Sequence, residues 1–197
     1  MTKTYLSVTV RGTTMIYTLF ILLALSVNGY ALSQPAPDNL DDVNQKFEKE
    51  YAAKKLRAEQ GDAQAQYEWG IDCIYRQKGT PADGLHWLLL SAAQGNVEAE
   101  AQAGICYAQG LGAEKNPEES LRLLRNAATK GNHYALMELG ILSMEGFGPL
   151  PKDLEQAEKY LSNAADKGNA AAKKYLEIVR DSLKKDRAPQ AGEKSSP

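Results

Sequence analysis

Residues 92–96 read AAQGN, and the same pattern returns as AATKGN at residues 127–132 and as AADKGN at residues 164–169. The Gly-Asn pairs are 36 and 37 residues apart, and Gly61-Asp62 lies one further step upstream. Tandem periods of this length are typical of stacked helical hairpins, in which each unit buries its apolar face against its neighbours. The spacing therefore predicts an all-α solenoid of antiparallel helix pairs.

Each repeat contains the start and stop signals of two helices. The marker Asn or Asp is expected to cap a first helix, and the marker Gly to end the second helix in the left-handed conformation. Second helices are expected to begin at Thr80-Pro81, Asn116-Pro117 and Asp153, because a capping side chain stands at each point and Pro suits the first helical position. Residues 61–167 therefore form three repeats.

The segments on either side of the repeats are expected to cover the ends of the stack, because terminal repeats need a polar outer surface. Residues 34–60 should form a linker and an N-terminal capping helix, and residues 168–185 a C-terminal capping helix. Residues 186–197 are polar and rich in Pro, Gly and Ser, and this composition predicts a disordered tail.

Residues 1–33 have the composition of a secretory signal peptide. They contain Lys3 and Arg11, no acidic residue, and an apolar run at residues 15–27 that is followed by small residues. Cleavage is expected after Ala31 or after Ser33, and the mature protein is then periplasmic or secreted. The alternative is an uncleaved inner-membrane anchor, although the apolar run is shorter than the roughly 20 residues that span a bilayer.

Charge and motifs exclude several classes of function. The formal net charge is −2 and becomes −4 once residues 1–33 are removed, which argues against binding to nucleic acid or, after cleavage, to an anionic membrane. His86 and His133 have no ligand-spaced partners, so no metal or other cofactor is expected. Ser182 begins the only S-x-x-K sequence, but the supporting S-D-N and K-T-G motifs do not occur. The chain is predicted not to be an enzyme.

The two cysteines, Cys73 and Cys106, leave two alternatives open. Export would permit a disulfide, and their spacing of 33 residues is close to the repeat length. The two positions are nevertheless out of register by one residue, which is about 100° around a helix. The competing interpretation is a pair of buried apolar thiols.

The repeats resemble the Sel1-like repeat family, a relative of the tetratricopeptide repeat. The family pattern A-x3-L-G-x2-Y-x2-G-x-G, a loop, then A-A and G-N is matched best by the second unit and next by the third, and the resemblance covers residues 38–185. Matching residues in the second unit are Ala99, Gly104, Tyr107, Gly110 and Gly112. In the third unit, Ser143 stands in place of the tyrosine, and the first unit lacks the loop glycines.

The resemblance implies a right-handed solenoid and a monomeric scaffold or adaptor that binds a partner protein or peptide in a groove along the first helices. An inhibitor or immunity-type protein against one toxin or enzyme is the alternative, and a β-lactamase-like or cell-wall enzyme is a remote one. By analogy with tetratricopeptide packing, the expected groove residues are Gln64, Tyr67, Ile71, Glu98, Ala101, Ile105, Tyr134, Met137, Ile141 and Lys174. The isoleucines could instead be core residues that face the second helices.

Overall fold

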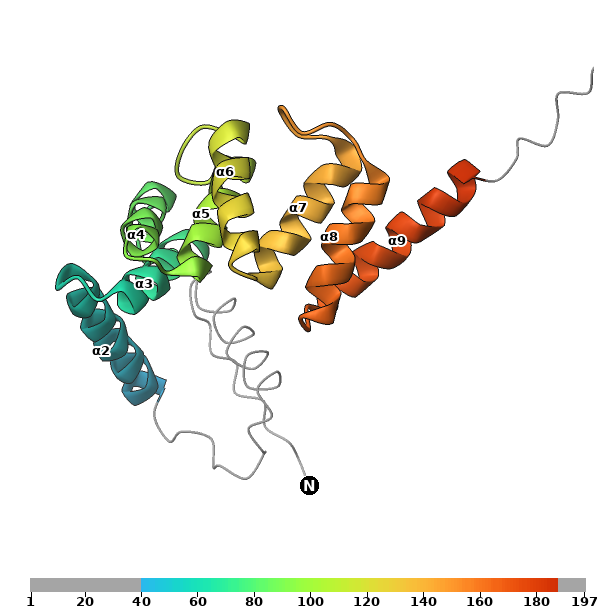
Figure 1. Cartoon of the computed structure of the whole chain (residues 1–197). Coiled ribbons are helices and arrows are strands. Elements are labelled where there is room, and N and C mark those ends of the chain that lie inside the picture. The colour runs from blue at the N-terminus through green and yellow to red at the C-terminus, as the bar shows by residue number, and fades with distance from the viewer. Residues whose placement is uncertain (1–39, 188–197) are drawn as a thin grey trace, which may run out of the picture. The chain divides into compact units, whose positions relative to one another are not determined.

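The structure is a computed structural model that describes residues 40–187, so the expected signal peptide, most of the N-terminal linker and the last ten residues lie outside the described range. Residues 40–187 contain eight α-helices and no β-strand (Figure 1). The helices are α2 (Leu40–Glu59), α3 (Ala63–Tyr75), α4 (Pro81–Ala93), α5 (Val97–Gln109), α6 (Pro117–Thr129), α7 (His133–Glu145), α8 (Leu154–Asp166) and α9 (Ala170–Arg187). Among the described residues, residues 47–187 form one compact unit that leaves out the first seven residues of α2, and the packing below concerns this unit.

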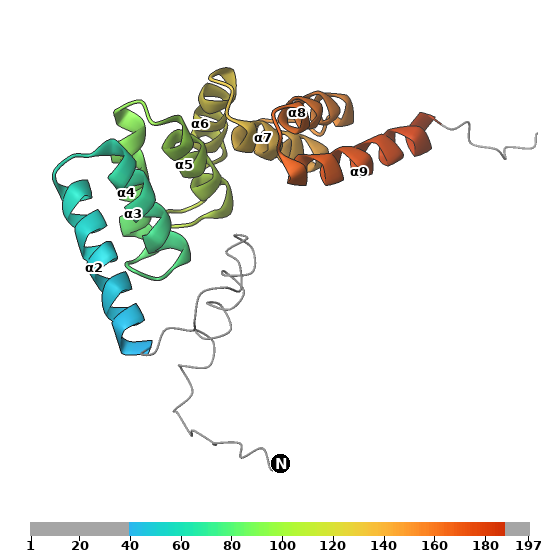
Figure 2. The same ribbon diagram turned by 90° about the horizontal axis from the view of Figure 1, so that it is seen from below.

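The helices of this unit pack as three consecutive hairpins. In each hairpin the first helix packs against the second, which gives the pairs α3 with α4, α5 with α6, and α7 with α8. Each second helix also packs against the following first helix, and α7 contacts both α5 and α9. Figure 2 shows α3, α5, α7 and α9 along one side and α4, α6 and α8 along the other. The predicted all-α solenoid is confirmed.

The marker residues perform the two roles that the sequence predicts for them. The side chains of Asp62, Asn96 and Asn132 each accept a hydrogen bond from a backbone N–H three residues later, at 2.9 Å in all three repeats. Gly95 and Gly131 have φ angles of 91° and 86°, which place them in the left-handed region between one hairpin and the next. Because Gly has no Cβ, it takes this conformation at little cost. Each marker therefore ends one repeat and begins the next.

The second helices begin where their capping signals stand. Thr80 and Asp83 form a reciprocal capping box at the start of α4, while Asn116 and Asp153 cap α6 and α8 through single side-chain bonds. The C-terminal helix α9 is longer than expected, since it continues to Arg187 rather than ending at residue 185.

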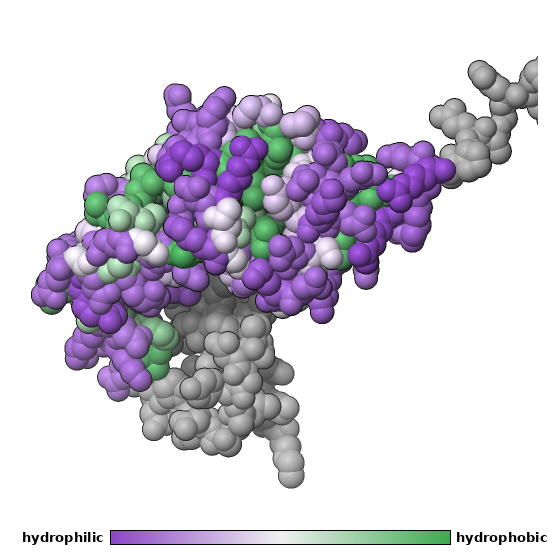
Figure 3. Space-filling model, in the orientation of Figure 1, coloured by the Kyte–Doolittle hydropathy of each residue, from purple (hydrophilic) through white to green (hydrophobic). Residues whose placement is uncertain are grey.

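The core lies between the two rows of helices and is made mostly of leucine and alanine. Leu88, Leu124 and Leu161 of the second helices are completely buried. Each contacts a glycine at the middle of its own hairpin's first helix, at Gly70, Gly104 and Gly140 respectively, where a Cβ would lie only 2.6–3.0 Å from the leucine Cγ. Hydrophobic residues consequently appear only as narrow patches on the mainly hydrophilic face in Figure 3.

We expect Gly84→Ala to lower the free energy of unfolding by about 1–3 kcal/mol. The α3–α4 hairpin has glycines on both helices, and a Cβ on Gly84 would lie 2.8 Å from the carbonyl oxygen of Gly70 and 2.4 Å from Cγ1 of Ile74. A carbonyl of the helix backbone cannot rotate away, so the helices must separate. This cost exceeds the gain of about 1 kcal/mol in helix propensity.

Urea unfolding followed by circular dichroism measures this effect. Ala93→Ser, at an exposed position near the end of the same helix, is the control and should change the free energy of unfolding by less than about 0.5 kcal/mol. A Gly84→Ala protein that is more stable than the wild type would show that the close approach of α3 and α4 is not required.

Candidate protein-binding surface

The side of the first helices that faces away from the second helices carries side chains at repeating positions. These positions are two, five, six and nine residues after the N-cap of each helix, which places them near one another on a helix of 3.6 residues per turn. We call the resulting surface of α3, α5 and α7 the first-helix face. At these positions it comprises Gln64, Tyr67, Glu68 and Ile71 of α3, Glu98, Gln102 and Ile105 of α5, and Tyr134, Met137, Glu138 and Ile141 of α7. Tyr75, four residues after Ile71, is added to it.

Hydrogen bonds join α3 to α5 across this face. The side-chain amide of Gln102 donates to the hydroxyl of Tyr75, and the cap residue Asn96 donates to the side-chain oxygen of Gln64 at 3.3 Å. These side chains come from different repeats. The bonds therefore fix the polar part of the face to the stack of helices.

Tyrosines and carboxylates lie close together on the face. Burial raises the pKa of Tyr67 above its ordinary value, and the charge of Glu98 on α5 raises this pKa further. Burial likewise raises the pKa of Tyr75, and Glu138 on α7 adds to that effect. Each of these two tyrosines of α3 is thus affected by a carboxylate of another repeat, and Glu98 also lines one hollow with Tyr134.

Glu138 is the most unusual carboxylate of the face. It is only partly exposed, and burial raises the pKa of its carboxyl above the ordinary value for glutamate. Among the described residues, no hydrogen bond or ion pair compensates this burial. Glu68, Gln102, Glu138 and Tyr75 were not among the predicted groove residues. Glu68, Gln102 and Glu138 could have been predicted from the sequence, because they stand one residue after Tyr67, Ala101 and Met137.

The predicted groove residues differ in exposure. Tyr134 is 53% exposed, and Gln64, Glu98 and Lys174 are exposed as well. Half-buried members are Tyr67, Ile71, Ile105, Met137 and Ile141. Tyr67 and Ile71 pack against one core cluster, and Ile105 and Met137 each pack against another, so these four contribute to the core as well as to the surface.

The prediction that Ala101 lines the groove was wrong, because its side chain does not reach the surface. Its side chain is 2% exposed and packs in a cluster with Leu121, Leu124 and Leu139. Tyr67 and Met137 occupy the equivalent positions in the neighbouring repeats and are long enough to reach the surface, whereas the single methyl group of Ala101 stays within the core.

The structure also decides between the two alternatives for the cysteines, and the disulfide was wrong. Cys73 and Cys106 are free thiols, 2% and 0% exposed, and no disulfide joins them. Cys73 packs with Ala58 and Trp69, whereas Cys106 packs in the next core cluster. The register difference of one residue aims the two side chains into different parts of the core, so the buried-thiol alternative holds.

We expect both thiols to react slowly in the native protein. Burial raises the pKa of Cys73 and of Cys106 to about 11, which leaves little thiolate at pH 8, and their surroundings also exclude the reagent. Ellman's reagent at pH 8 should modify native protein far more slowly than protein in 6 M guanidinium, where two thiols should react. Single serine variants assign each reaction to one cysteine. Rapid reaction without denaturant would contradict the buried placement.

Two of the residues that catalysis or metal binding would use, Ser182 and His133, have hydrogen-bonding partners within the fold. The Ser182 hydroxyl donates to the backbone carbonyl of Ile178 at 3.0 Å, and Nδ1 of His133 lies 3.2 Å from the amide of Asn169. Within residues 40–187 no group of three His, Cys, Asp or Glu side chains is arranged to hold a metal ion. In the same range, no helix combines the length and the apolar character that a membrane span requires.

Comparison with known proteins identifies the repeats. The family model described as Sel1 repeat matches residues 63–96, 97–132 and 133–169, which is more than half of the chain. The crystal structure of a Sel1 repeat protein from Oxalobacter formigenes is similar, with a TM-score of 0.53, 28% sequence identity, and coverage of 66% of this chain and 98% of that one.

Two curated relatives are much longer proteins. DAP3-binding cell death enhancer 1 of Mus musculus is 30% identical over 115 residues, which are 58% of this chain and 22% of the relative. The chitin synthase regulator SKT5 of Saccharomyces cerevisiae is 32% identical over 82 residues, 40% of this chain and 12% of the relative. The chain thus spans less than a quarter of either relative. The three repeats and the shared fold show that the chain belongs to the Sel1 repeat family.

Proposed function

We propose that this chain is an exported scaffold that binds a partner protein through the first-helix face. Sel1 repeat proteins mediate protein–protein interaction, and stacked helical repeats in general offer extended surfaces for this purpose. The export part of the proposal is supported by the basic start and the apolar run of residues 1–33.

The observation that carries the binding proposal is the composition of the face. Tyr134 is 53% exposed beside the half-buried Tyr67 and Met137, and these three side chains come from two different repeats. Tyrosine is enriched among the residues that contribute most to binding energy, and methionine adapts its shape to a partner. A row of such side chains suits a helix or an extended segment of another protein.

The test is an affinity capture from extracts of the native host with the purified chain lacking residues 1–33. The variant Tyr67→Ala/Tyr134→Ala/Met137→Ala should lose the captured partner, because it removes the largest side chains of the face. The matched control Leu90→Ala/Arg125→Ala/Lys159→Ala changes three exposed residues of the second helices and should retain it. Retention of the partner by the first variant would show that binding uses another surface.

Export is tested separately. Expressed with residues 1–33, the chain should appear in the periplasmic fraction of a Gram-negative host. Its intact mass should correspond to a first residue of Leu32 or Gln34. Recovery of the full-length mass from the membrane fraction would replace this part of the proposal with the inner-membrane anchor.

A further inference from the structure

The three helices that build the first-helix face contain no lysine or arginine. Their sequences AQAQYEWGIDCIY, VEAEAQAGICYAQ and HYALMELGILSME carry six carboxylates among them. Two of the six are neutralised from outside these helices: Asp72 pairs with Lys54 and Arg76, and Glu100 pairs with Lys130 at 2.7 Å. The other four, Glu68, Glu98, Glu138 and Glu145, have no ion pair within the described residues.

The unpaired carboxylates lie where tyrosines also gather. Glu98 and Tyr134 line the same hollow, and Tyr134 precedes Glu138 by four residues on α7, which places the two on one side of the helix. An ammonium or guanidinium group binds favourably both to a carboxylate and to the face of an aromatic ring. This combination selects cations, and it repels the phosphates of nucleic acids and of anionic lipids.

Among the carboxylates of the face, Glu138 should be stabilised most by such a cation. Its carboxylate is partly buried and has no partner in the described part of the chain, so its charge is held at a cost. A basic side chain placed beside it would offset that cost. Beyond the two glutamates, toward the C-terminal ends of α5 and α7, the half-buried Ile105 and Ile141 offer an apolar strip, and the half-buried Met137 adjoins Glu138 in the chain.

Basic groups lie beside the face but form no ion pair with Glu68, Glu98, Glu138 or Glu145 within the described residues. One of them, the Lys167 ammonium, lies next to Gly131, which lines the same hollow as Glu98. Lys130 and Glu98 line one hollow of about 230 Å³ together with His133 and Tyr134, but the Lys130 ammonium is bound to Glu100. Lys174 belongs to α9, at the far end of the row. The acidic stretch therefore covers α3, α5 and α7, and a partner lying along it needs positive charge.

We propose that the first-helix face binds a basic amphipathic segment of the partner protein, with lysine or arginine side chains on Glu98 and Glu138 and apolar side chains on Met137, Ile105 and Ile141. This inference rests on the proposed function and specifies the chemistry of the partner.

The test uses three fluorescein-labelled peptides of eighteen residues with identical leucine and alanine positions. Their polar positions are all lysine, all glutamine or all glutamate. Fluorescence anisotropy with the chain lacking residues 1–33 should show the lysine peptide binding at least about tenfold more tightly than the glutamine peptide, and the glutamate peptide more weakly than either.

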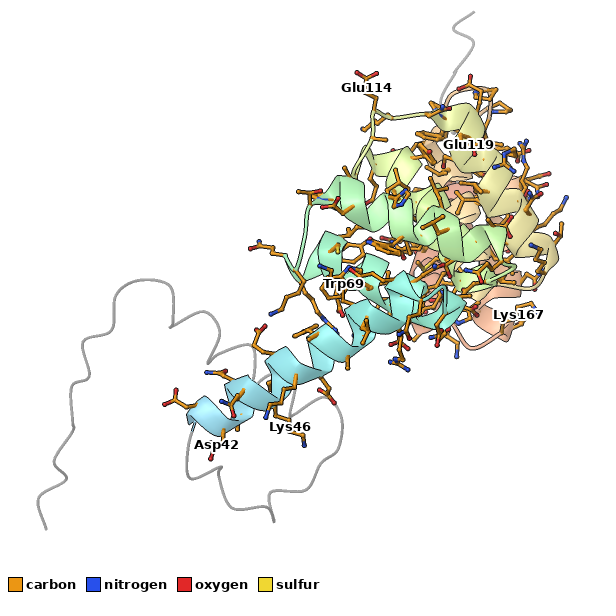
Figure 4. All side chains as sticks on the ribbon, turned by 90° about the vertical axis from the view of Figure 1, so that its left-hand side faces the viewer. Asp42, Lys46, Trp69, Glu114, Glu119 and Lys167 are labelled. Carbon is orange, nitrogen blue, oxygen red and sulfur yellow. The ribbon has the colours of Figure 1, made fainter. Side chains whose placement is uncertain are left out.

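Matched variants separate the face from the general negative charge of the protein. Glu98→Gln/Glu138→Gln should weaken binding of the lysine peptide about tenfold. Glu114→Gln/Glu118→Gln removes the same charge elsewhere and should leave binding within about twofold. Glu114 projects from the loop between α5 and α6, as Figure 4 shows, and Glu118 is exposed in the first turn of α6.

Two results would overturn the inference. One is equal binding of the lysine and glutamine peptides, and the other is lysine-peptide binding that Glu98→Gln/Glu138→Gln leaves unchanged. The proposed function is judged independently, because partner capture that depends on Tyr67, Tyr134 and Met137 would stand after either result. Failure of that capture would instead remove the proposed function itself.

Discussion

Replacing Asp72 with asparagine should lower the free energy of unfolding by about 3 kcal/mol. The Asp72 carboxylate is 1% exposed, and it accepts hydrogen bonds from the Lys54 ammonium of α2 and from the Arg76 guanidinium at 2.7 Å. The amide of asparagine has the same shape but no charge. Lys54, only 20% exposed, would then keep its ammonium half-buried without a counter-ion.

Urea unfolding measures this loss, and limited trypsin digestion shows where it acts. Lys54 connects the C-terminal half of α2 to the first hairpin, so Asp72→Asn should also speed cleavage after Lys55 and Arg57. Glu59→Gln is the matched control: its carboxylate is 49% exposed and lies 3.7 Å from Lys55, a geometry that contributes less than about 1 kcal/mol. A loss below about 0.5 kcal/mol in Asp72→Asn would show that this ion pair does not hold α2.

The double variant Asp72→Asn/Lys54→Met tests the same contact by a mutant cycle. Removing both charges leaves no buried ion unpaired. The double variant should therefore lose less stability than the sum of the losses in Asp72→Asn and Lys54→Met alone. Additive losses would mean that Asp72 stabilises the fold through Arg76 and the helix backbone alone.

The repeat pattern predicted the helices because their signals are local. Gly95 with Asn96, and Thr80 with Pro81, act through backbone conformation and hydrogen bonds within four residues, so the sequence alone is enough to locate them. Trp69 at the end of the stack is different. It is buried with Ala58 of α2 and labelled in Figure 4, and its neighbours depend on how α2 docks, which no repeat specifies.

The candidate site was predicted less well, because the surroundings of its side chains also depend on how the helices pack. The analogy with tetratricopeptide repeats places Tyr134 and Met137 on the outer side of the first helices, where the structure has them. It gives no means of separating Ala101, which is too short to leave the core, from Tyr67 at the equivalent position. Its position one residue after Met137 could have placed Glu138 on the face, but the partial burial of its carboxylate without a partner is visible only once the helices are placed side by side.

Leu124→Ala should lower the free energy of unfolding by about 2–5 kcal/mol. Leu124 is completely buried in the middle repeat, in a cluster with Ala101, Leu121 and Leu139, and its Cγ fills the space above Gly104. Glycine offers no side chain that could move into the resulting cavity. The surrounding helices therefore cannot collapse fully around it.

Because Leu124 lies in the central hairpin, its replacement should affect the unfolding of the array beyond the loss of its own contacts. In a stack of repeats each hairpin is stabilised by its two neighbours, so weakening the central hairpin uncouples the first repeat from the third. Urea unfolding of Leu124→Ala should accordingly show a broader transition with a lower slope as well as a lower midpoint. The conservative variant Leu124→Met nearly preserves the volume and should cost less than about 1.5 kcal/mol.

Leu183→Ala, in the terminal helix α9, completes the comparison. Leu183 is 8% exposed and contacts only the last core cluster. Leu183→Ala should therefore lower the free energy of unfolding less than Leu124→Ala does, and it should leave the slope of the transition unchanged. Equal slopes in the Leu124 and Leu183 variants would mean that the array unfolds as a single unit. In that case the first-helix face, which needs α3, α5 and α7 in register, would be held by the whole stack and not by its central hairpin.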